Sequence, residues 1–166
     1  MDEHPIVMHI PRLRRYARAL GNERYLADDL VQDTLERAWN KYHLWRPGSD
    51  LRAWLFAIMH NVFVNQMRGR RMDLEQLTDE TPTVAVRATQ SDGLELADLR
   101  RALSRLSVEH REILLLVAVE QMKYDDVSQT LGIPMGTVMS RLSRARERLR
   151  QHLDGVANVV SLKVIK

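Results

Sequence analysis

The stretch from Tyr124 to Leu153 constrains the fold more than any other part of the sequence, because it joins two helical patterns through a tight turn. Apolar residues repeat at helical spacing from Tyr124 to Leu131. Gly132 follows at a helix end, where a residue that can adopt positive φ is favoured. Pro134 suits the first turn of a second helix, since its missing N–H is not needed there. The pattern predicts a short helix, a turn and a longer helix.

The predicted second helix has an apolar face and a separate basic face. Its core-facing residues are Val138, Leu142, Ala145 and Leu149. The residues that we expect to contact DNA lie on the polar, basic side and are Thr137, Ser140, Arg141, Arg144 and Arg148. A basic stripe is usually only a solvated face, so it carries little weight alone. Together with the turn and the small Ser128, which permits a close helix crossing, it favours a DNA-binding helix-turn-helix.

Composition favours helices and excludes several kinds of chemistry. The chain has 166 residues, of which 45% are hydrophobic, 5% are aromatic and seven are glycine, and this balance favours packed helices over a β-sandwich or barrel. It has no cysteine, so disulfides, thiolate metal sites and cysteine nucleophiles are excluded. Its six histidines are scattered without metal-ligand spacing, and no catalytic constellation stands out. We therefore expect neither an enzyme nor a metal or cofactor site.

Charge and hydropathy limit where the protein can be located and what it can bind. The sequence shows no signal-peptide pattern and no apolar run of membrane-spanning length. This predicts a cytoplasmic protein that does not insert into a membrane. The net charge is only +3, so any argument for nucleic-acid binding depends on local clusters of charge.

Two helices predicted in the N-terminal half carry polar stripes. The helix from Glu23 to Tyr42 has a wide apolar face, and opposite it lies an acidic stripe made of Asp29, Gln32, Asp33 and Glu36. The helix from Leu51 to Arg70 is apolar on nearly all sides, which indicates burial on several of them. Its polar exceptions share one side and are Asn61, Asn65 and Arg68. Acidic stripes are ordinarily solvated faces, so the acidic stripe alone defines no partner.

The chain divides into two predicted helical domains. Residues 1–71 form the first, and residues 94–154 form the second, which contains the helix-turn-helix. Residues 72–93 between them are acidic and lack an apolar period, so we expect a flexible linker that proteases cut first. Residues 155–166 form a β-prone tail with no evident role. The expected fold class is all-α.

Three segments of the sequence, in the expected order, resemble the bacterial sigma factors, and in particular their short extracytoplasmic-function branch. The segments are ADDLVQDTLERAW (Ala27–Trp39), PGSDLRAWLFAIMHN (Pro47–Asn61) and YDDVSQTLGIPMGTVMSRLSRARERL (Tyr124–Leu149). The resemblance implies that the protein binds core RNA polymerase and directs promoter-specific initiation of transcription. It also implies that an anti-sigma factor holds the protein inactive until a signal arrives.

The same resemblance implies roles for the surfaces described above. The acidic stripe is expected to dock on the clamp helices of the polymerase β′ subunit. Asn61, Asn65 and Arg68 are expected to contact the −10 promoter element, while the Trp45–Asp50 loop captures a flipped-out base. The helix-turn-helix is expected to read the −35 element in the major groove and to rest on the polymerase β flap.

Two other classes of protein are alternatives at this point. An autonomous helix-turn-helix regulator would bind its duplex without polymerase, but it leaves the acidic stripe and the apolar Leu51–Arg70 helix unexplained. An enzyme that acts on nucleic acid would need catalytic groups, which the sequence does not bring together. Adjacent acids such as Asp28 and Asp29 point about 100° apart on a helix and serve one cation poorly.

Overall fold

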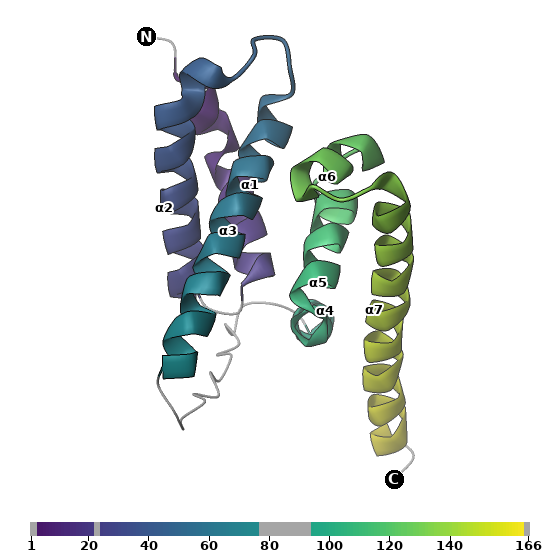
Figure 1. The fold of residues 1–166 in the computed structure, drawn as a ribbon. Helices are drawn as coiled ribbons and strands as arrows, with labels where there is room; N and C mark the ends of the chain where they lie inside the picture. Colours follow the sequence, from purple (N-terminus) through teal and green to yellow (C-terminus); the bar gives the residue numbers. More distant parts are fainter. Residues whose placement is uncertain (1–2, 22–23, 77–93, 165–166) are drawn as a thin grey trace. The chain divides into compact units, whose positions relative to one another are not determined.

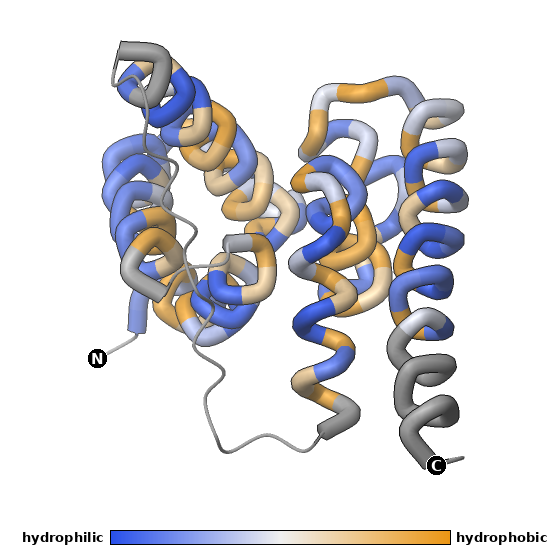
Figure 2. The backbone as a smooth tube through the Cα atoms, turned by 90° about the horizontal axis from the view of Figure 1, so that it is seen from below, coloured by the Kyte–Doolittle hydropathy of each residue, from blue (hydrophilic) through white to orange (hydrophobic). Residues whose placement is uncertain are grey.

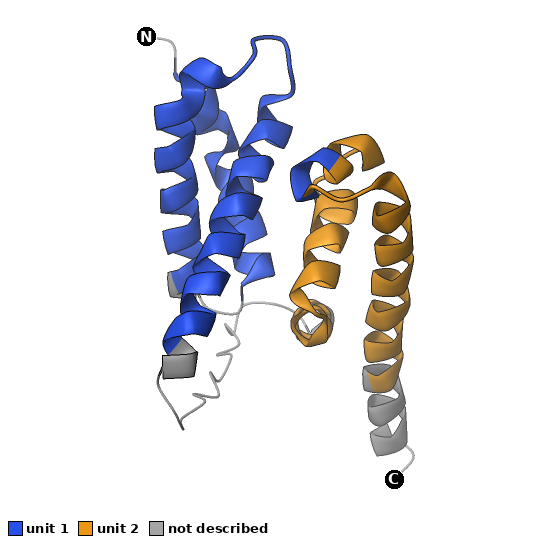
Figure 3. Cartoon of the chain, in the orientation of Figure 1, with its two compact units in different colours: residues 1–86, 129–131 blue, residues 87–128, 132–166 orange. Residues whose placement is uncertain are grey.

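The computed structural model describes residues 3–21, 24–76 and 94–164. These residues form helices joined by short turns, and no strand occurs among them. The prediction of an all-α fold is therefore confirmed. The chain divides into two compact units, which comprise residues 1–86 with 129–131 and residues 87–128 with 132–166 (Figure 3).

The first unit is a helical bundle (Figure 1). Its elements are the 3-10 turn η1 (Pro5–His9), α1 (Ile10–Leu20), α2 (Arg24–Lys41), the 3-10 turn η2 (Tyr42–Leu44) and α3 (Leu51–Gln76). α2 packs along both α1 and α3. Figure 2 shows hydrophobic residues alternating with hydrophilic ones along these helices, as expected for helices that each bury one face.

The core of this bundle takes side chains from all three long helices. Among its fully buried residues are Leu13, Leu20, Leu55, Phe56 and Met59. The ring of Tyr16 meets the ring of Phe56 edge to face with centroids 4.9 Å apart, which is a favourable arrangement for an aromatic pair. Thr34 is also buried, and its hydroxyl donates to the carbonyl of Leu30 over 2.7 Å, so this buried hydroxyl has a hydrogen-bond partner. This core fixes the positions of α2 and α3, which bear the polar stripes.

α3 is longer than the sequence predicts. It continues to Gln76, past the predicted end at Arg70, so the first residues of the predicted linker 72–93 are helical. The physical reason is that residues 71–76 contain neither Gly nor Pro, and an acidic composition alone does not end a helix. The rest of the predicted linker, residues 77–93, lies outside the described residues.

The burial expected on several sides of α3 is found in its first half but not in its second half. Leu55, Phe56 and Met59 in the first half are fully buried. Phe63 is only half-buried, and Met67 is exposed. A helix with few packing neighbours keeps at least one face at the surface, whatever its sequence. The apolar residues of the second half therefore contribute to the surface of this unit.

The second unit contains α4 (Leu94–Arg105), α5 (Val108–Leu114), the π-helical segment η3 (Leu115–Val119), α6 (Tyr124–Leu131) and α7 (Met135–Val164). α7 packs along α4 and α5 (Figure 1). Ser107 caps α5, because its hydroxyl accepts a hydrogen bond from the N–H of His110 over 3.3 Å. The buried residues of this unit include Ala102, Ile113, Leu116, Val127, Val138 and Leu142.

Arg111 is a buried residue whose role the sequence does not reveal. Its guanidinium donates hydrogen bonds to the carbonyls of Leu103, Ser104 and Leu106 at the end of α4, over 2.9, 3.2 and 3.0 Å. A helix end leaves carbonyls without partners, so a cation is favourable there. Burial lowers the pKa of Arg111, but arginine starts so high that the side chain stays charged. Arg111 therefore ties α5 to the end of α4.

The described part of the C-terminal tail, residues 155–164, is helical, against its predicted β character. α7 runs without interruption from Met135 to Val164, so residues 155–164 continue the same helix. Extending an existing helix avoids the unfavourable nucleation step. The strand preference of a valine-rich segment is weaker than this local effect, because it depends on a sheet to pack against.

Candidate nucleic-acid and polymerase-binding surfaces

The turn between α6 and α7 depends on a glycine and a serine. Gly132 ends α6 with φ 65° and ψ 36°, the left-handed conformation that its position in the sequence predicts. The hydroxyl of Ser128 donates to the carbonyl of Ile133 over 2.6 Å, and the Ser128 carbonyl accepts from the Ile133 N–H over 3.1 Å. Ser128 is therefore more than a small residue at a helix crossing, because both its side chain and its backbone hold the turn closed.

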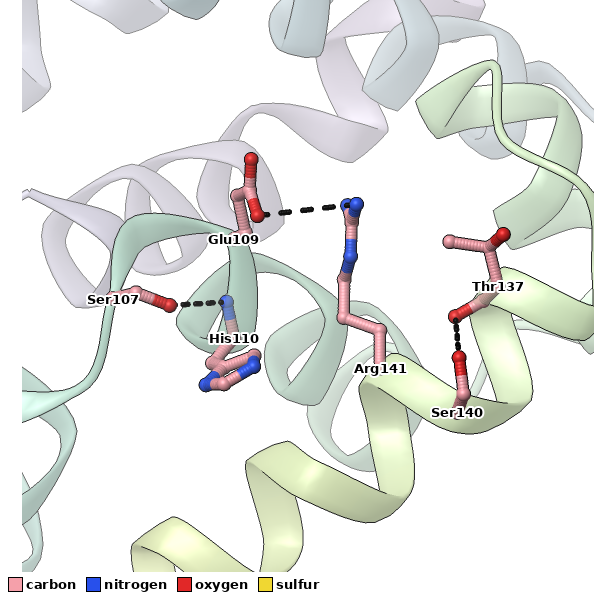
Figure 4. A network of polar contacts seen from close by, with 6 residues as sticks. All are labelled: Ser107, Glu109, His110, Thr137, Ser140 and Arg141. Atoms are coloured by element: carbon pink, nitrogen blue, oxygen red, sulfur yellow. Dashed lines mark hydrogen bonds and ion pairs between the residues drawn. The ribbon is translucent and has the colours of Figure 1, made fainter.

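The residues predicted to contact DNA differ in exposure along α7. Ser140, Arg144 and Arg148 are exposed. Thr137 is half-buried, and its carbonyl accepts a hydrogen bond from the Ser140 hydroxyl over 3.2 Å (Figure 4). The opposite side of the helix is buried at Val138, as predicted. The basic stripe is thus open to a partner mainly through Ser140, Arg144 and Arg148.

Arg141 differs from the other basic residues of the stripe because it points toward α5. Its guanidinium lies 3.9 Å from the carboxylate of Glu109, and its side chain is 24% exposed (Figure 4). A surface ion pair of this kind contributes only about 0–1 kcal/mol to stability. Its main consequence is that the orientation of Arg141 is restricted, which no pattern in the sequence indicates.

His110, which the sequence analysis did not single out, lies on α5 beside the same basic stripe (Figure 4). Burial lowers the pKa of His110, and the charges of Arg148 and Arg141 lower it further, while Glu109 acts in the opposite direction. The imidazole therefore stays neutral at pH values where an ordinary histidine takes up a proton. No sequence signal marks this residue, because its environment comes from a different helix.

This shift predicts that acid destabilises the protein through His110. The unfolded chain has the ordinary histidine pKa near about 6.5 and binds the proton more readily than the folded chain, so stability is lost as the pH falls from that value toward the lowered pKa. We expect His110→Gln to lose less stability than the wild type between about pH 7.5 and about pH 5.5 in urea unfolding. Burial and, to a smaller extent, the charge of Arg12 also lower the pKa of His9. His9→Gln should therefore separately reduce the stability that the protein loses as the pH falls. Equal losses in all proteins would contradict the prediction.

A groove lies along another side of α7. It has a volume of about 470 Å³ and is lined by Tyr124, Met139, Ser143, Arg146, Glu147 and Arg150, among others. The Glu147 carboxylate and the Arg150 guanidinium are 2.6 Å apart in an ion pair. Met139 is 57% exposed and neighbours Ser140 in the sequence, so its side chain offers an apolar contact to a partner next to the exposed Ser140. No pattern in the sequence marks Met139.

The acidic stripe lies on α2, away from its buried residues. Asp29, Gln32 and Glu36 are exposed, and within the described part of the chain they make no hydrogen bond or ion pair. Asp33 is half-buried and is tied to α3, because Nε2 of Gln66 donates to its Oδ2 over 2.7 Å. The stripe therefore presents free acidic and amide groups, with one carboxylate held in place.

The residues predicted to contact the −10 element lie on the surface of α3, and all three are exposed: Asn61, Asn65 and Arg68. The loop before α3 is held by local hydrogen bonds. The Ser49 hydroxyl donates to the carbonyl of Arg46 over 2.6 Å, and Gly48 adopts φ 91°. Asp50 caps α3, since its carboxylate accepts a hydrogen bond from the N–H of Ala53 over 3.3 Å.

Aromatic side chains anchor the start of this loop to the end of α2. Trp45 is half-buried and stacks on Tyr42 with ring centroids 5.6 Å apart. The ring of His4 lies 4.4 Å from that of Trp39 and 4.3 Å from that of Tyr42. The indole N–H of Trp45 is buried and has no hydrogen-bond partner among the described residues. Trp45 therefore supports the loop by packing rather than by a polar contact.

The described surfaces suit binding by ion pairs, hydrogen bonds and apolar contacts. In the ranges that the structure describes, no group of His, Asp and Glu side chains is arranged to hold a metal ion. None of the helices in these ranges is both long and apolar enough to cross a membrane.

Two family models match the chain, one in each half of the sequence. Residues 6–60 match the model described as "Sigma2 domain of PhyR", and residues 96–149 match "Sigma-70, region 4". The first match covers α1, α2 and the beginning of α3, and the second runs from α4 into α7. Both descriptions name sigma-type domains, which points to the sigma-factor class of transcription proteins.

Individual relatives agree with this class. The chain is 38% identical to the ECF RNA polymerase sigma factor EcfG of Rhodopseudomonas palustris (strain TIE-1), over 90% of this chain and 84% of that protein. The solved structure of the sigma factor RpoE with the anti-sigma factor NepR from Bartonella quintana is similar with a TM-score of 0.79 and 39% identity, over 90% of this chain and 94% of that one. CnrH, solved with the cytosolic domain of CnrY, is similar with a TM-score of 0.65 and 30% identity, over 90% and 85% of the two chains.

The chain belongs to the extracytoplasmic-function (ECF) RNA polymerase sigma factors. Proteins of this family bind core RNA polymerase and direct promoter-specific initiation of transcription, and that is the function of this chain. The resemblance identified from three sequence segments is therefore confirmed, and the alternative of an autonomous helix-turn-helix regulator is not favoured.

Proposed function

We propose that the acidic stripe on α2 is the surface that docks on the clamp helices of the polymerase β′ subunit. Its residues are Asp29, Gln32, Asp33 and Glu36. The observation that supports this assignment most strongly is that Asp29 and Glu36 are exposed and have no partner within the described residues. Free carboxylates on a helix fixed by a packed core attract a basic partner surface and set its register. The polymerase carries out RNA synthesis, so this chain needs no catalytic residue and no cofactor.

The polar side of α3 and the loop before it form our proposed −10 reader. Asn61 and Asn65 are exposed amides, which can hydrogen-bond to base edges, and Arg68 can contact a phosphate. The Trp45–Asp50 loop is stiffened by the hydrogen bond from Ser49 to Arg46 and by the cap at Asp50. A loop held in this way is suited to enclosing a base that has left the stack.

The helix-turn-helix is our proposed −35 reader. α7 would lie in the major groove and contact it through Thr137, Ser140, Arg141, Arg144 and Arg148, while the surrounding domain rests on the polymerase β flap. The exposure of Ser140, Arg144 and Arg148 supports this assignment. In this proposal residues 1–71 and residues 94–154 act as separate domains, one for each promoter element.

An anti-sigma factor is the proposed regulator of this chain. Two similar solved structures, RpoE and CnrH, are complexes with the anti-sigma factor NepR and with the cytosolic domain of CnrY, respectively. A protein that binds over the acidic stripe would prevent docking to polymerase. Because polymerase and chromosomal DNA are in the cytoplasm, we place the activity of this chain there.

The experiment that tests the promoter assignments is transcription by core RNA polymerase on a library of promoters, with and without this protein. We expect initiation from a restricted set of sequences only when the protein is present. The set should share two elements separated by a defined spacing, because two separate domains read them. If the active promoters share only one element, one of the two assigned reading surfaces is wrong.

Exchanging the loop tests the −10 assignment. Replacing residues 45–50 by those of another short sigma factor should change the preferred −10 sequence and leave the −35 preference as it was, because the loop lies in the first unit. Sequencing of transcripts from the same promoter library measures both preferences. The matched control is a Ser140→Ala variant of α7, which should leave the −10 preference unchanged. An unchanged −10 preference after the loop exchange would place base capture elsewhere.

A further inference from the structure

One hydrogen bond connects the acidic stripe to the helix that bears the −10 residues. Gln66 of α3 donates from Nε2 to Oδ2 of Asp33 on α2 over 2.7 Å. Both side chains are half-buried where the two helices pack together. The other three members of the stripe make no such contact within the described residues. Asp33 is therefore the one member of the stripe whose orientation is set by α3.

The chemistry of this contact leaves Asp33 able to bind a cation. Gln66 holds only Oδ2, and Oδ1 has no hydrogen-bond partner in the described part of the chain. Glutamine is a neutral donor, so it orients the carboxylate without cancelling its negative charge. A lysine or arginine at this position would also hold Asp33, but it would neutralise the charge that a basic partner needs.

We propose that Gln66 is a positioning residue for the polymerase-docking surface: its amide presents the Asp33 carboxylate, still charged, to a basic side chain of the polymerase. The inference rests on the proposed docking role of Asp33. A carboxylate that is already oriented loses less conformational freedom on binding, so the complex is tighter than one formed by a mobile side chain. Gln66 itself contacts α2 rather than the polymerase.

A different role for Gln66 would be to read promoter bases beside Asn65, since glutamine amides can pair with adenine. Its half-buried position and its bond to Asp33 favour the positioning role, because the amide is already engaged. The two roles predict different measurements. A positioning residue affects polymerase binding in the absence of DNA, whereas a base-reading residue affects only promoter preference.

The test measures the affinity of the full chain for core RNA polymerase without DNA. Gln66→Ala removes the donor, and we expect binding about three- to ten-fold weaker than in the wild type, the amount that a pre-oriented side chain contributes. Gln66→Glu keeps the shape but places a second carboxylate beside Asp33, and it should bind at least as weakly. Gln66→Lys distinguishes positioning of the Asp33 carboxylate from a bond that only stabilises the fold. The lysine restores a donor to Asp33, but its positive charge neutralises the carboxylate. It should recover the thermal stability of the wild type but not its affinity for polymerase.

A double-mutant cycle completes the test. Gln66→Ala should have no further effect in an Asp33→Ala background, whereas its effect should add to that of Asp29→Ala, which has no contact with Gln66. If Gln66→Ala binds like the wild type, or if its effect adds to that of Asp33→Ala, the positioning role is overturned while the docking surface stands. If Asp33→Ala itself binds like the wild type, Asp33 is not a docking residue, and the inference fails together with that assignment.

Discussion

A double Asp29→Lys, Asp33→Lys variant is expected to fold and to lose its binding to core RNA polymerase. Asp29 is exposed, and Asp33 makes a single hydrogen bond to Gln66, so the reversal leaves the buried core of the bundle intact. We expect a loss of about 1.5–3 kcal/mol in stability, the contribution of one hydrogen bond to a charged group. At the docking surface the same change places like charges together, which costs several kcal/mol and is enough to abolish a specific complex.

The measurement is a polymerase-binding titration together with circular dichroism and a thermal melt. The matched control is a double Glu3→Lys, Asp73→Lys variant, which changes the net charge by the same amount at exposed positions of the first unit outside the acidic stripe. We expect it to bind polymerase normally. A folded Asp29→Lys, Asp33→Lys variant with undiminished affinity would show that the polymerase docks elsewhere.

Replacing both Arg144 and Arg148 by alanine is expected to abolish most of the −35-dependent transcription. Both side chains are exposed on α7 and neither makes an ion pair within the described residues, so their removal should barely change the thermal stability. A contact to a base is worth about 1–3 kcal/mol, so the loss of two contacts lowers the use of the −35 element by at least about ten-fold. Contacts to phosphate would instead weaken binding to all sequences alike and lower its salt dependence.

The comparison uses promoters with and without a −35 element, transcribed by the polymerase with each variant. Arg146→Ala is the matched control, because Arg146 is exposed but lines the groove on another side of α7. It should leave −35 preference unchanged. Normal −35 use by the Arg144→Ala, Arg148→Ala variant would remove these arginines from the interface with DNA. Arg141 is expected to behave differently, because Glu109 restricts its orientation.

Local sequence patterns predicted most of the elements that bear the two surfaces. Gly132 predicted the turn between α6 and α7, because only a left-handed residue ends the helix in that way. Helical spacing predicted the buried side of α7 and the shared polar side of Asn61 and Asn65 on α3. Each of these features depends on residues within one or two turns of one another, so the sequence contains the information directly.

Other features depend on neighbours that are distant in the sequence. The helical course of residues 71–76 and 155–164 follows from the ease of extending an existing helix, which their composition does not indicate. The incomplete burial of α3 depends on how many helices pack against it, which its own pattern does not contain.

The sequence by itself determined the all-α class, the helix-turn-helix signals and the membership of the sigma-factor family. The tertiary structure alone decided how individual side chains on these surfaces are held. Gln66 orients Asp33, Glu109 restricts Arg141, and Arg111 caps the end of α4. Each contact joins residues on different helices, and a side chain finds such a partner only after packing has brought the two helices together.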